Sequence, residues 1–146
     1  WTFDLAKNTN DYKWERLDDL ACEFPRLDER YTGVNYRYGY FAADNNPQFK
    51  VGGFNAIGRR DHETGKVELH DVGEACATNE PIFVPRSADA PEGDGFLLAN
   101  VYDANRKASH LVILDAQNVS GKPLAKAYLD HRVPFGFHGN WAQDVA

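Results

Sequence analysis

The sequence predicts an all-β fold of short antiparallel strands, and three observations lead to this prediction. The 146 residues are 42% hydrophobic and 13% aromatic, which is typical of a folded domain rather than of a disordered chain. Segments that are rich in aromatic residues, or that alternate apolar and polar residues, recur at short and regular spacing. Turn-forming Asp, Asn, Gly and Pro separate these segments, where a mixed fold would have helices.

The first half of the chain predicts one group of strands. A short strand over 2–5 opens it, and the polar stretch 8–19 carries the only weak helical or turn-rich pattern. Four strands are then expected, at 21–24, 36–43, 54–61 and 66–72. The turn sequences are Asp44-Asn45-Asn46-Pro47 and Glu63-Thr64-Gly65, of which the second closes a hairpin.

The second half predicts four more strands, at 81–84, 95–103, 110–116 and 125–131. Four consecutive antiparallel strands form one blade of a β-propeller, so we expect one blade over 80–131 and a neighbouring blade before it. The apolar runs PIFV, GFLLANVY and LVILDA are continuous, which suits strands covered on both faces by adjacent blades. A β-sandwich is the alternative, because strand count does not separate the two folds and no WD or kelch repeat marks the blades.

The charge distribution excludes a nucleic-acid-binding surface. The net charge is −6 and the isoelectric point is about 5.3, whereas a phosphate-binding face needs clustered Lys and Arg. The one basic pair that stands out, Arg59-Arg60, is soon followed by Asp61 and Glu63. We expect it in a solvated hairpin.

Several smaller features bear on the extent and location of the protein. The chain opens on Trp1, contains no Met, and shows neither a signal peptide nor an apolar run that could cross a bilayer. We therefore expect residues 1–146 to be one part of a larger, cytoplasmic protein. Cys22 and Cys76 lie far apart without a CxxC partner, which predicts two small buried hydrophobic residues rather than a zinc site.

Of the five histidines, His138 has the most distinctive surroundings. It follows Pro134-Phe135-Gly136-Phe137 and precedes Gly139, so small residues allow the backbone to turn while aromatic residues enclose the ring. An imidazole in dry, aromatic surroundings is a plausible metal ligand. His62 in a charged hairpin and His110 at a strand start are expected to be ordinary solvated or hydrogen-bonded residues.

Glu23 and Glu80 are the two acidic residues with unusual neighbours. Glu23 stands in ACEFPRL and Glu80 in NEPIFVP, and a carboxylate buried in such an apolar strand needs a partner. One partner would be the ring N–H of a metal-bound histidine, which the carboxylate would orient. The alternative is an ion pair with an arginine such as Arg26 or Arg86.

The ordered motifs of this chain resemble those of the carotenoid cleavage oxygenases, a family that includes lignostilbene dioxygenases and the retinal isomerase of the eye. The resemblance begins near Glu23 and covers most of the chain. Its motifs are EFPRLDERYTG with YRYGY (23–40), EPIFVPR (80–86), EGDGFLLANVYD (92–103), SHLVILDA (109–116) and RVPFGFHGNW (132–141).

The resemblance implies a seven-bladed β-propeller with Fe(II) on its axis, held by four histidines that glutamates orient. By the FHG motif His138 resembles the last of the four ligands, and Glu23 and Glu80 resemble two of the orienting carboxylates. None of His62, His70, His110 and His131 lies in a matching motif, so this chain resembles the C-terminal portion of such an enzyme, with about two blades.

The activity that the resemblance implies is cleavage of a conjugated C=C bond by O₂ into two carbonyl products, with no reductant or organic cofactor. The substrate would be a small apolar or phenolic alkene, either a stilbene or a carotenoid or apocarotenoid, and the motifs favour a bacterial enzyme of the stilbene or apocarotenoid type. Peripheral membrane contact would involve other segments. The alternatives are an iron-dependent isomerohydrolase and a non-catalytic propeller segment that serves in binding or assembly.

Overall fold

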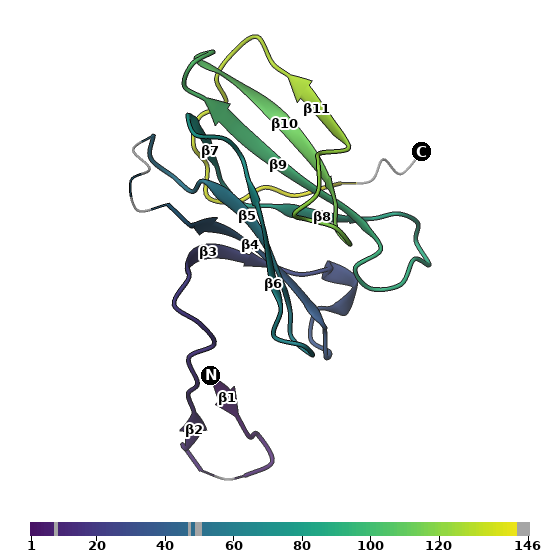
Figure 1. The fold of residues 1–146 in the computed structure, drawn as a ribbon. Helices are drawn as coiled ribbons and strands as arrows, with labels where there is room; N and C mark the ends of the chain where they lie inside the picture. Colours follow the sequence, from purple (N-terminus) through teal and green to yellow (C-terminus); the bar gives the residue numbers. More distant parts are fainter. Residues whose placement is uncertain (8, 47, 49–50, 143–146) are drawn as a thin grey trace.

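The computed structural model describes residues 1–7, 9–46, 48 and 51–142. These residues form an all-β structure whose only helical element is a single 3-10 turn, η1 (Figure 1). The elements in chain order are β1 (Thr2–Phe3), β2 (Tyr12–Lys13), β3 (Ala21–Arg26), η1 (Glu29–Tyr31), β4 (Tyr38–Asp44), β5 (Ala56–Asp61), β6 (Val67–Asp71), β7 (Cys76–Thr78), β8 (Ile82–Pro85), β9 (Gly95–Asp103), β10 (Ala108–Asp115) and β11 (Ala125–Tyr128).

Two antiparallel sheets follow each other along the chain, one from each of the two predicted groups of strands. The first sheet has the order β3-β4-β5-β6 and the second has the order β11-β10-β9-β7, with β8 also paired to β9. Within each sheet, strands that are consecutive in the chain pair with each other, except that β7 and β8 both pair with β9. The small hairpin β1–β2 lies apart from both sheets (Figure 1).

The first strand of the second blade is interrupted, which the sequence pattern did not reveal. Both β7 and β8 pair with β9, Thr78 opposite Val101 and Ile82 opposite Leu98. Three residues lie between Thr78 and Ile82 on this edge, whereas two lie between Leu98 and Val101 on β9, so the edge contains one extra residue. Such a bulge changes the direction of the side chains at the break, and Glu80 stands at its centre.

The hydrophobic core lies between the two sheets. Tyr40 and Ile57 from the first sheet pack with Leu97, Val101 and other fully buried residues of the second. The ring of Tyr40 stacks on that of Phe83 with a centroid distance of 5.4 Å. Burial of the Tyr40 phenol raises its pKa above the usual value of a tyrosine. This core fixes the first sheet against β8, and thereby against Glu80.

Within the described part of 8–19 the structure has the strand β2, which pairs with β1, and no helix, so the helical alternative for this stretch was wrong. Two further predictions about local structure were also wrong. Arg59 and Arg60 lie in β5 with side chains only 12% exposed, paired with Glu68 and Asp18, instead of in a solvated hairpin. Cys22 is exposed, since it lies on the edge strand β3, while Cys76 is half-buried; both are free thiols.

Hydrogen bonds typical of turns are present in the described residues of both predicted turns. Residues 62–66 connect β5 to β6, and the N–H of Gly65 donates to the carbonyl of Asp61 at 2.8 Å. Asp44 accepts from the N–H of Asn46 at 3.1 Å, as turn-forming Asp does. Pro47 lies outside the described residues. No helix among the residues described here is long and apolar enough to cross a bilayer.

Replacing Gly95 by alanine is expected to destabilise the second blade. A Cβ at this position would lie 2.3 Å from the carbonyl oxygen of Val84 and 2.7 Å from the ring of Phe83. The carbonyl belongs to a paired strand and cannot move aside alone, so we expect a loss of about 1–3 kcal/mol in the free energy of unfolding. Denaturant unfolding measures it.

Gly136→Ala is the matched control, because a Cβ there meets no atom within 4 Å and the backbone φ is not positive. We expect its stability to stay within about 0.5 kcal/mol of the wild type. A Gly95→Ala protein as stable as this control would show that β8 and β9 do not approach as closely as described.

Candidate metal centre

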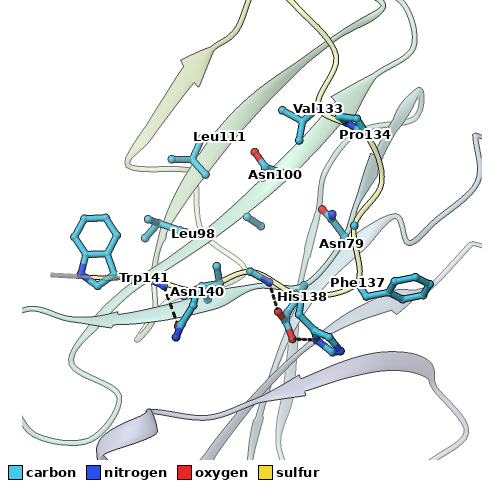
Figure 2. Close-up of a pocket in the computed structure, with 15 residues that line it drawn as sticks. Asn79, Leu98, Asn100, Leu111, Val133, Pro134, Phe137, His138, Asn140 and Trp141 are labelled. Carbon is cyan, nitrogen blue, oxygen red and sulfur yellow. Dashed lines mark hydrogen bonds and ion pairs between the residues drawn. The ribbon is translucent and has the colours of Figure 1, made fainter.

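The C-terminal segment after β11 carries His138 back to the start of the second blade. It first stays beside β10, because the N–H of Ser109 donates to the carbonyl of His131 at 2.9 Å and the N–H of Val133 donates to the Ser109 hydroxyl at 3.0 Å. It then crosses a groove of about 400 Å³, lined by Leu98, Leu111 and Trp141 among others. His138 and Gly139 contact Glu80 at the β7–β8 break, and the segment then continues to Asn140 and Trp141 (Figure 2).

His138 and Glu80 meet at that break. Nδ1 of His138 lies 3.1 Å from Oε1 of Glu80. The other carboxylate oxygen accepts the backbone N–H of Gly139 at 2.9 Å. Glu80 is 7% exposed. One buried carboxylate therefore binds both the imidazole of His138 and the backbone N–H of Gly139.

The protonation state of Glu80 determines which ring nitrogen of His138 is free. Burial alone would raise the pKa of Glu80, but the N–H of Gly139, the hydrogen bond to His138 and the charge of Arg26 outweigh it and hold the pKa below its usual value. An ionised carboxylate only accepts hydrogen bonds, so Nδ1 carries the proton. The lone pair of a neutral ring is then on Nε2, which is the nitrogen left for a metal.

Nε2 lies on the open side of the ring. The His138 side chain is 75% exposed, and among the described residues no hydrogen bond to Nε2 is formed. Figure 2 shows the ring pointing away from Leu98 and Leu111 in the groove. The open nitrogen therefore faces outward from this chain.

The expectation of a dry, aromatic enclosure around His138 was wrong for this chain. Phe137 is itself 78% exposed and turns away from His138 (Figure 2). The aromatic ring near the imidazole is instead Phe24, whose centroid lies 6.0 Å away in an edge-on arrangement. Phe24 comes from β3 and has a positive φ of 57°, so a distortion of the first blade brings this ring to the site.

Both expected partners of Glu80 are present. Nη1 of Arg26 lies 3.2 Å from Oε2 of Glu80, so the carboxylate binds an arginine and the imidazole at once. Arg86 pairs with Asp94 at 2.8 Å instead. Glu80 therefore contacts both an imidazole and an arginine, the two kinds of partner that the sequence left as alternatives.

Glu23 lies in β3 and does not contact His138. It is exposed, and the described residues offer it no hydrogen bond or ion pair. Like Glu80, it stands on the edge strand of its sheet and directly at a register irregularity, here between Glu23 and Arg26. Its predicted role toward an imidazole outside this chain stays a prediction.

The other histidines stay away from this site. The ring of His62 packs edge-on against Tyr36, and His131 contacts the adjacent Asp130 at 2.7 Å. Burial lowers the pKa of His62, His70 and His110. The described part of the chain contains no group of three or more His, Cys, Asp or Glu that could hold a metal, so His138 is a single donor.

His110 is expected to make stability depend on pH. It is 3% exposed, and neither ring nitrogen has a hydrogen-bond partner among the described atoms. Burial, aided by the charge of Lys126, lowers its pKa in the folded state. The unfolded chain, with a pKa of about 6.5, then binds more protons than the folded one. Stability is therefore lost as the pH falls through about 6.5 and stops falling below the folded pKa.

In His110→Phe this part of the pH dependence should disappear. Denaturant unfolding between pH 7.5 and 5.5 measures it as the slope of the unfolding free energy. Val112→Ala is the control, because Val112 is buried on the same strand and carries no titrating group, so it should keep the wild-type slope. An unchanged slope in His110→Phe would show that His110 is not the group responsible.

Known proteins resemble this chain in sequence and in fold. The family model described as retinal pigment epithelial membrane protein, the model of the carotenoid cleavage oxygenases, matches residues 1–143. The chain belongs to the carotenoid cleavage oxygenase family. The match includes the segment of His138 and both edge strands with their glutamates.

Individual members of the family resemble the chain over almost its whole length. Lignostilbene-α,β-dioxygenase isozyme III of Sphingomonas paucimobilis is 41% identical over 97% of this chain and 31% of its own length. The crystal structure of Pseudomonas brassicacearum lignostilbene dioxygenase superposes with a TM-score of 0.89 at 34% identity, over 99% of this chain and 32% of that one. Cobalt-substituted Synechocystis apocarotenoid oxygenase gives a TM-score of 0.80 at 37% identity, over 88% and 26%.

These superpositions confirm the propeller prediction over the sandwich, because the structures matched are β-propeller enzymes. The chain spans about a third of the length of the relatives it matches. The two sheets are therefore propeller blades, and His138 and Glu80 lie on the edge of the second.

Proposed function

We propose that this chain is the C-terminal portion of a non-heme Fe(II) dioxygenase that splits a conjugated C=C bond with O₂ into two carbonyl products. The observation that carries the proposal is the contact between Glu80 and Nδ1 of His138, which leaves Nε2 open on an exposed ring. A buried carboxylate on one nitrogen and an open second nitrogen are the arrangement of a metal-bound histidine.

The donor chemistry of the site fits iron. A neutral imidazole suits Fe(II), whereas the chain offers no thiolate at this site. His138 would be one ligand, and three further histidines would come from parts of the protein outside this chain. When bound, Fe(II) supplies an open coordination position for O₂, and no reductant is needed because both oxygen atoms enter the two products.

The residues of this chain orient the ligand. Glu80 keeps the proton on Nδ1, and the N–H of Gly139 holds the carboxylate from its other side. A hydrogen-bonded carboxylate also makes the imidazole a stronger donor. We propose that Glu23 does the same for a histidine from another blade, since it occupies the equivalent edge of the first sheet.

For the substrate we propose a phenolic stilbene. Support comes from the relatives that this chain resembles at 41% identity and with a TM-score of 0.89, which are both named lignostilbene dioxygenases. A carotenoid or apocarotenoid is the alternative, since the chain also superposes on an apocarotenoid oxygenase. Both are conjugated alkenes, so the bond cleaved is of the same type.

Product analysis under ¹⁸O₂ tests the proposal in the full-length protein. Purified protein loaded with Fe(II) is given a hydroxylated stilbene or an apocarotenoid in separate reactions. We expect two aldehydes from the stilbene, each with one labelled oxygen. Labelled aldehydes from the apocarotenoid alone would overturn the substrate class, an unlabelled isomerised alcohol would indicate an isomerohydrolase, and an iron-free, inactive protein would indicate a binding or assembly role.

A further inference from the structure

We infer that Arg26 is a positioning residue for the metal ligand His138. One guanidinium joins three parts of the molecule: strand β3, the carboxylate of Glu80 at the β7–β8 break, and the backbone directly after His138. This inference rests on the proposed function, because it assigns Arg26 a part in holding the iron ligand.

Both terminal nitrogens of the Arg26 guanidinium, Nη1 and Nη2, make hydrogen bonds. Nη1 donates to Oε2 of Glu80 and to the carbonyl of Gly139, each at 3.2 Å. Nη2 donates to Oδ1 of Asn140 at 3.3 Å and also pairs with Glu29. The Arg26 side chain is 17% exposed and that of Glu80 is 4% exposed, so the central pair is shielded from water.

The bulge in β3 is what directs Arg26 toward the site. Glu23 is opposite Ala42 and Arg26 is opposite Tyr40. Arg26 is three positions after Glu23, whereas Tyr40 is two positions before Ala42, so β3 contains one extra residue. Tyr40 and Ala42 share one face of their strand, and Tyr40 packs in the core against the second sheet. Without the extra residue Arg26 would point to the opposite face of the sheet.

The segment around His138 has few other restraints. Residues 132–142 form no strand or helix, and Phe137, His138 and Gly139 are all exposed. Near the imidazole the backbone is held by the N–H of Gly139 on Glu80 and by the carbonyl of Gly139 on Arg26. Because the same guanidinium also holds the carboxylate that binds Nδ1, its loss would release ring and backbone together.

An arginine suits this role better than a lysine. Its planar fork presents several N–H donors in fixed directions, and here four acceptors surround it. An ammonium group can satisfy some of these acceptors, but not both Glu80 and Asn140 in the same fixed geometry. The charge of either residue would still offset that of Glu80.

The test measures metal affinity, not turnover, in the full-length protein. Apo protein is titrated anaerobically with Fe(II), and separately with Co(II), whose absorption spectrum reports the ligands. For Arg26→Gln we expect about tenfold weaker binding, the lower end of the range for groups that orient a metal ligand. Arg26→Lys should fall between Arg26→Gln and the wild type.

Arg86→Gln is the matched control, since it removes another arginine that pairs with a carboxylate, Asp94, and makes no contact with the His138 segment. It should bind metal within about twofold of the wild type. Thermal unfolding of each apo protein shows whether the variants are folded. Equal losses of affinity in Arg86→Gln and Arg26→Gln would reduce Arg26 to a general structural role and overturn the inference.

A double-mutant cycle with Glu80→Gln separates positioning from stability. If Arg26 acts through Glu80, Arg26→Gln should weaken metal binding much less in the Glu80→Gln background than in the wild type. Strictly additive effects would contradict the inference.

The proposed function fails on a different result: a wild-type protein that binds no metal, or a His138→Ala protein that binds it normally. Normal binding in Arg26→Gln alone would overturn only the role of Arg26.

Discussion

Replacing His138 by alanine is expected to abolish iron binding by the full-length protein, and with it the cleavage of the alkene. Nε2 of His138 is the donor that this chain offers, and its ring is already fixed by Glu80 at 3.1 Å. Groups that merely orient a ligand are worth about 10–100-fold in metal affinity, so we expect removal of the ligand itself to cost about 100-fold or more. Iron content after anaerobic loading measures this loss.

His131→Ala is the control for this experiment. His131 lies seven positions before His138, on the same C-terminal segment, and its exposed ring contacts only Asp130 among the described residues. We expect wild-type iron content and activity from this variant. Stoichiometric iron in His138→Ala would refute the assignment of His138 as a ligand, whatever the activity.

Replacing Leu97 by alanine is expected to have the largest effect on stability. Leu97 lies in β9, is fully buried at 0% exposure, and belongs to the core between the two sheets. Removal of a buried leucine side chain leaves a cavity and typically costs 2–5 kcal/mol, so we expect about 3 kcal/mol here. Unfolding in denaturant measures this difference.

Leu124→Ala removes the same atoms from a side chain that is 55% exposed. We expect it to change stability by no more than about 0.5 kcal/mol. If the two leucine variants were equally stable, the core between the blades would not be a principal source of stability in this part of the protein.

The strand pattern could be predicted from the sequence because it depends on local periodicity. Strands such as β9 and β10 have long apolar runs, and their observed bounds, Gly95–Asp103 and Ala108–Asp115, lie close to the predicted 95–103 and 110–116. The short strands β2 and β7 were missed, because two or three residues carry no periodic signal.

The site was predicted in part, and the missing part is geometric. Glu80 and His138 are separated by 58 positions, and their contact depends on the break between β7 and β8, where Pro81 follows Glu80. A bulge of one residue leaves no periodic trace in the sequence. The same holds for Phe24 and Arg26, which reach the site through the irregularity in β3.

The exposure of His138 also could not be predicted from the sequence pattern. Aromatic neighbours along the chain suggested an enclosed ring, but Phe137 turns outward and the ring is 75% exposed. Adjacent residues in an extended segment point to opposite sides, so Phe137 is poorly placed to cover His138.

The most direct test of the proposed metal centre is a crystal structure of the full-length, iron-loaded protein with anomalous data collected on both sides of the iron absorption edge. We expect an anomalous peak within bonding distance of Nε2 of His138, with Nδ1 still bound to Glu80. A peak coordinated only by other residues, or an iron-loaded protein in which Nε2 of His138 faces solvent, would contradict the account.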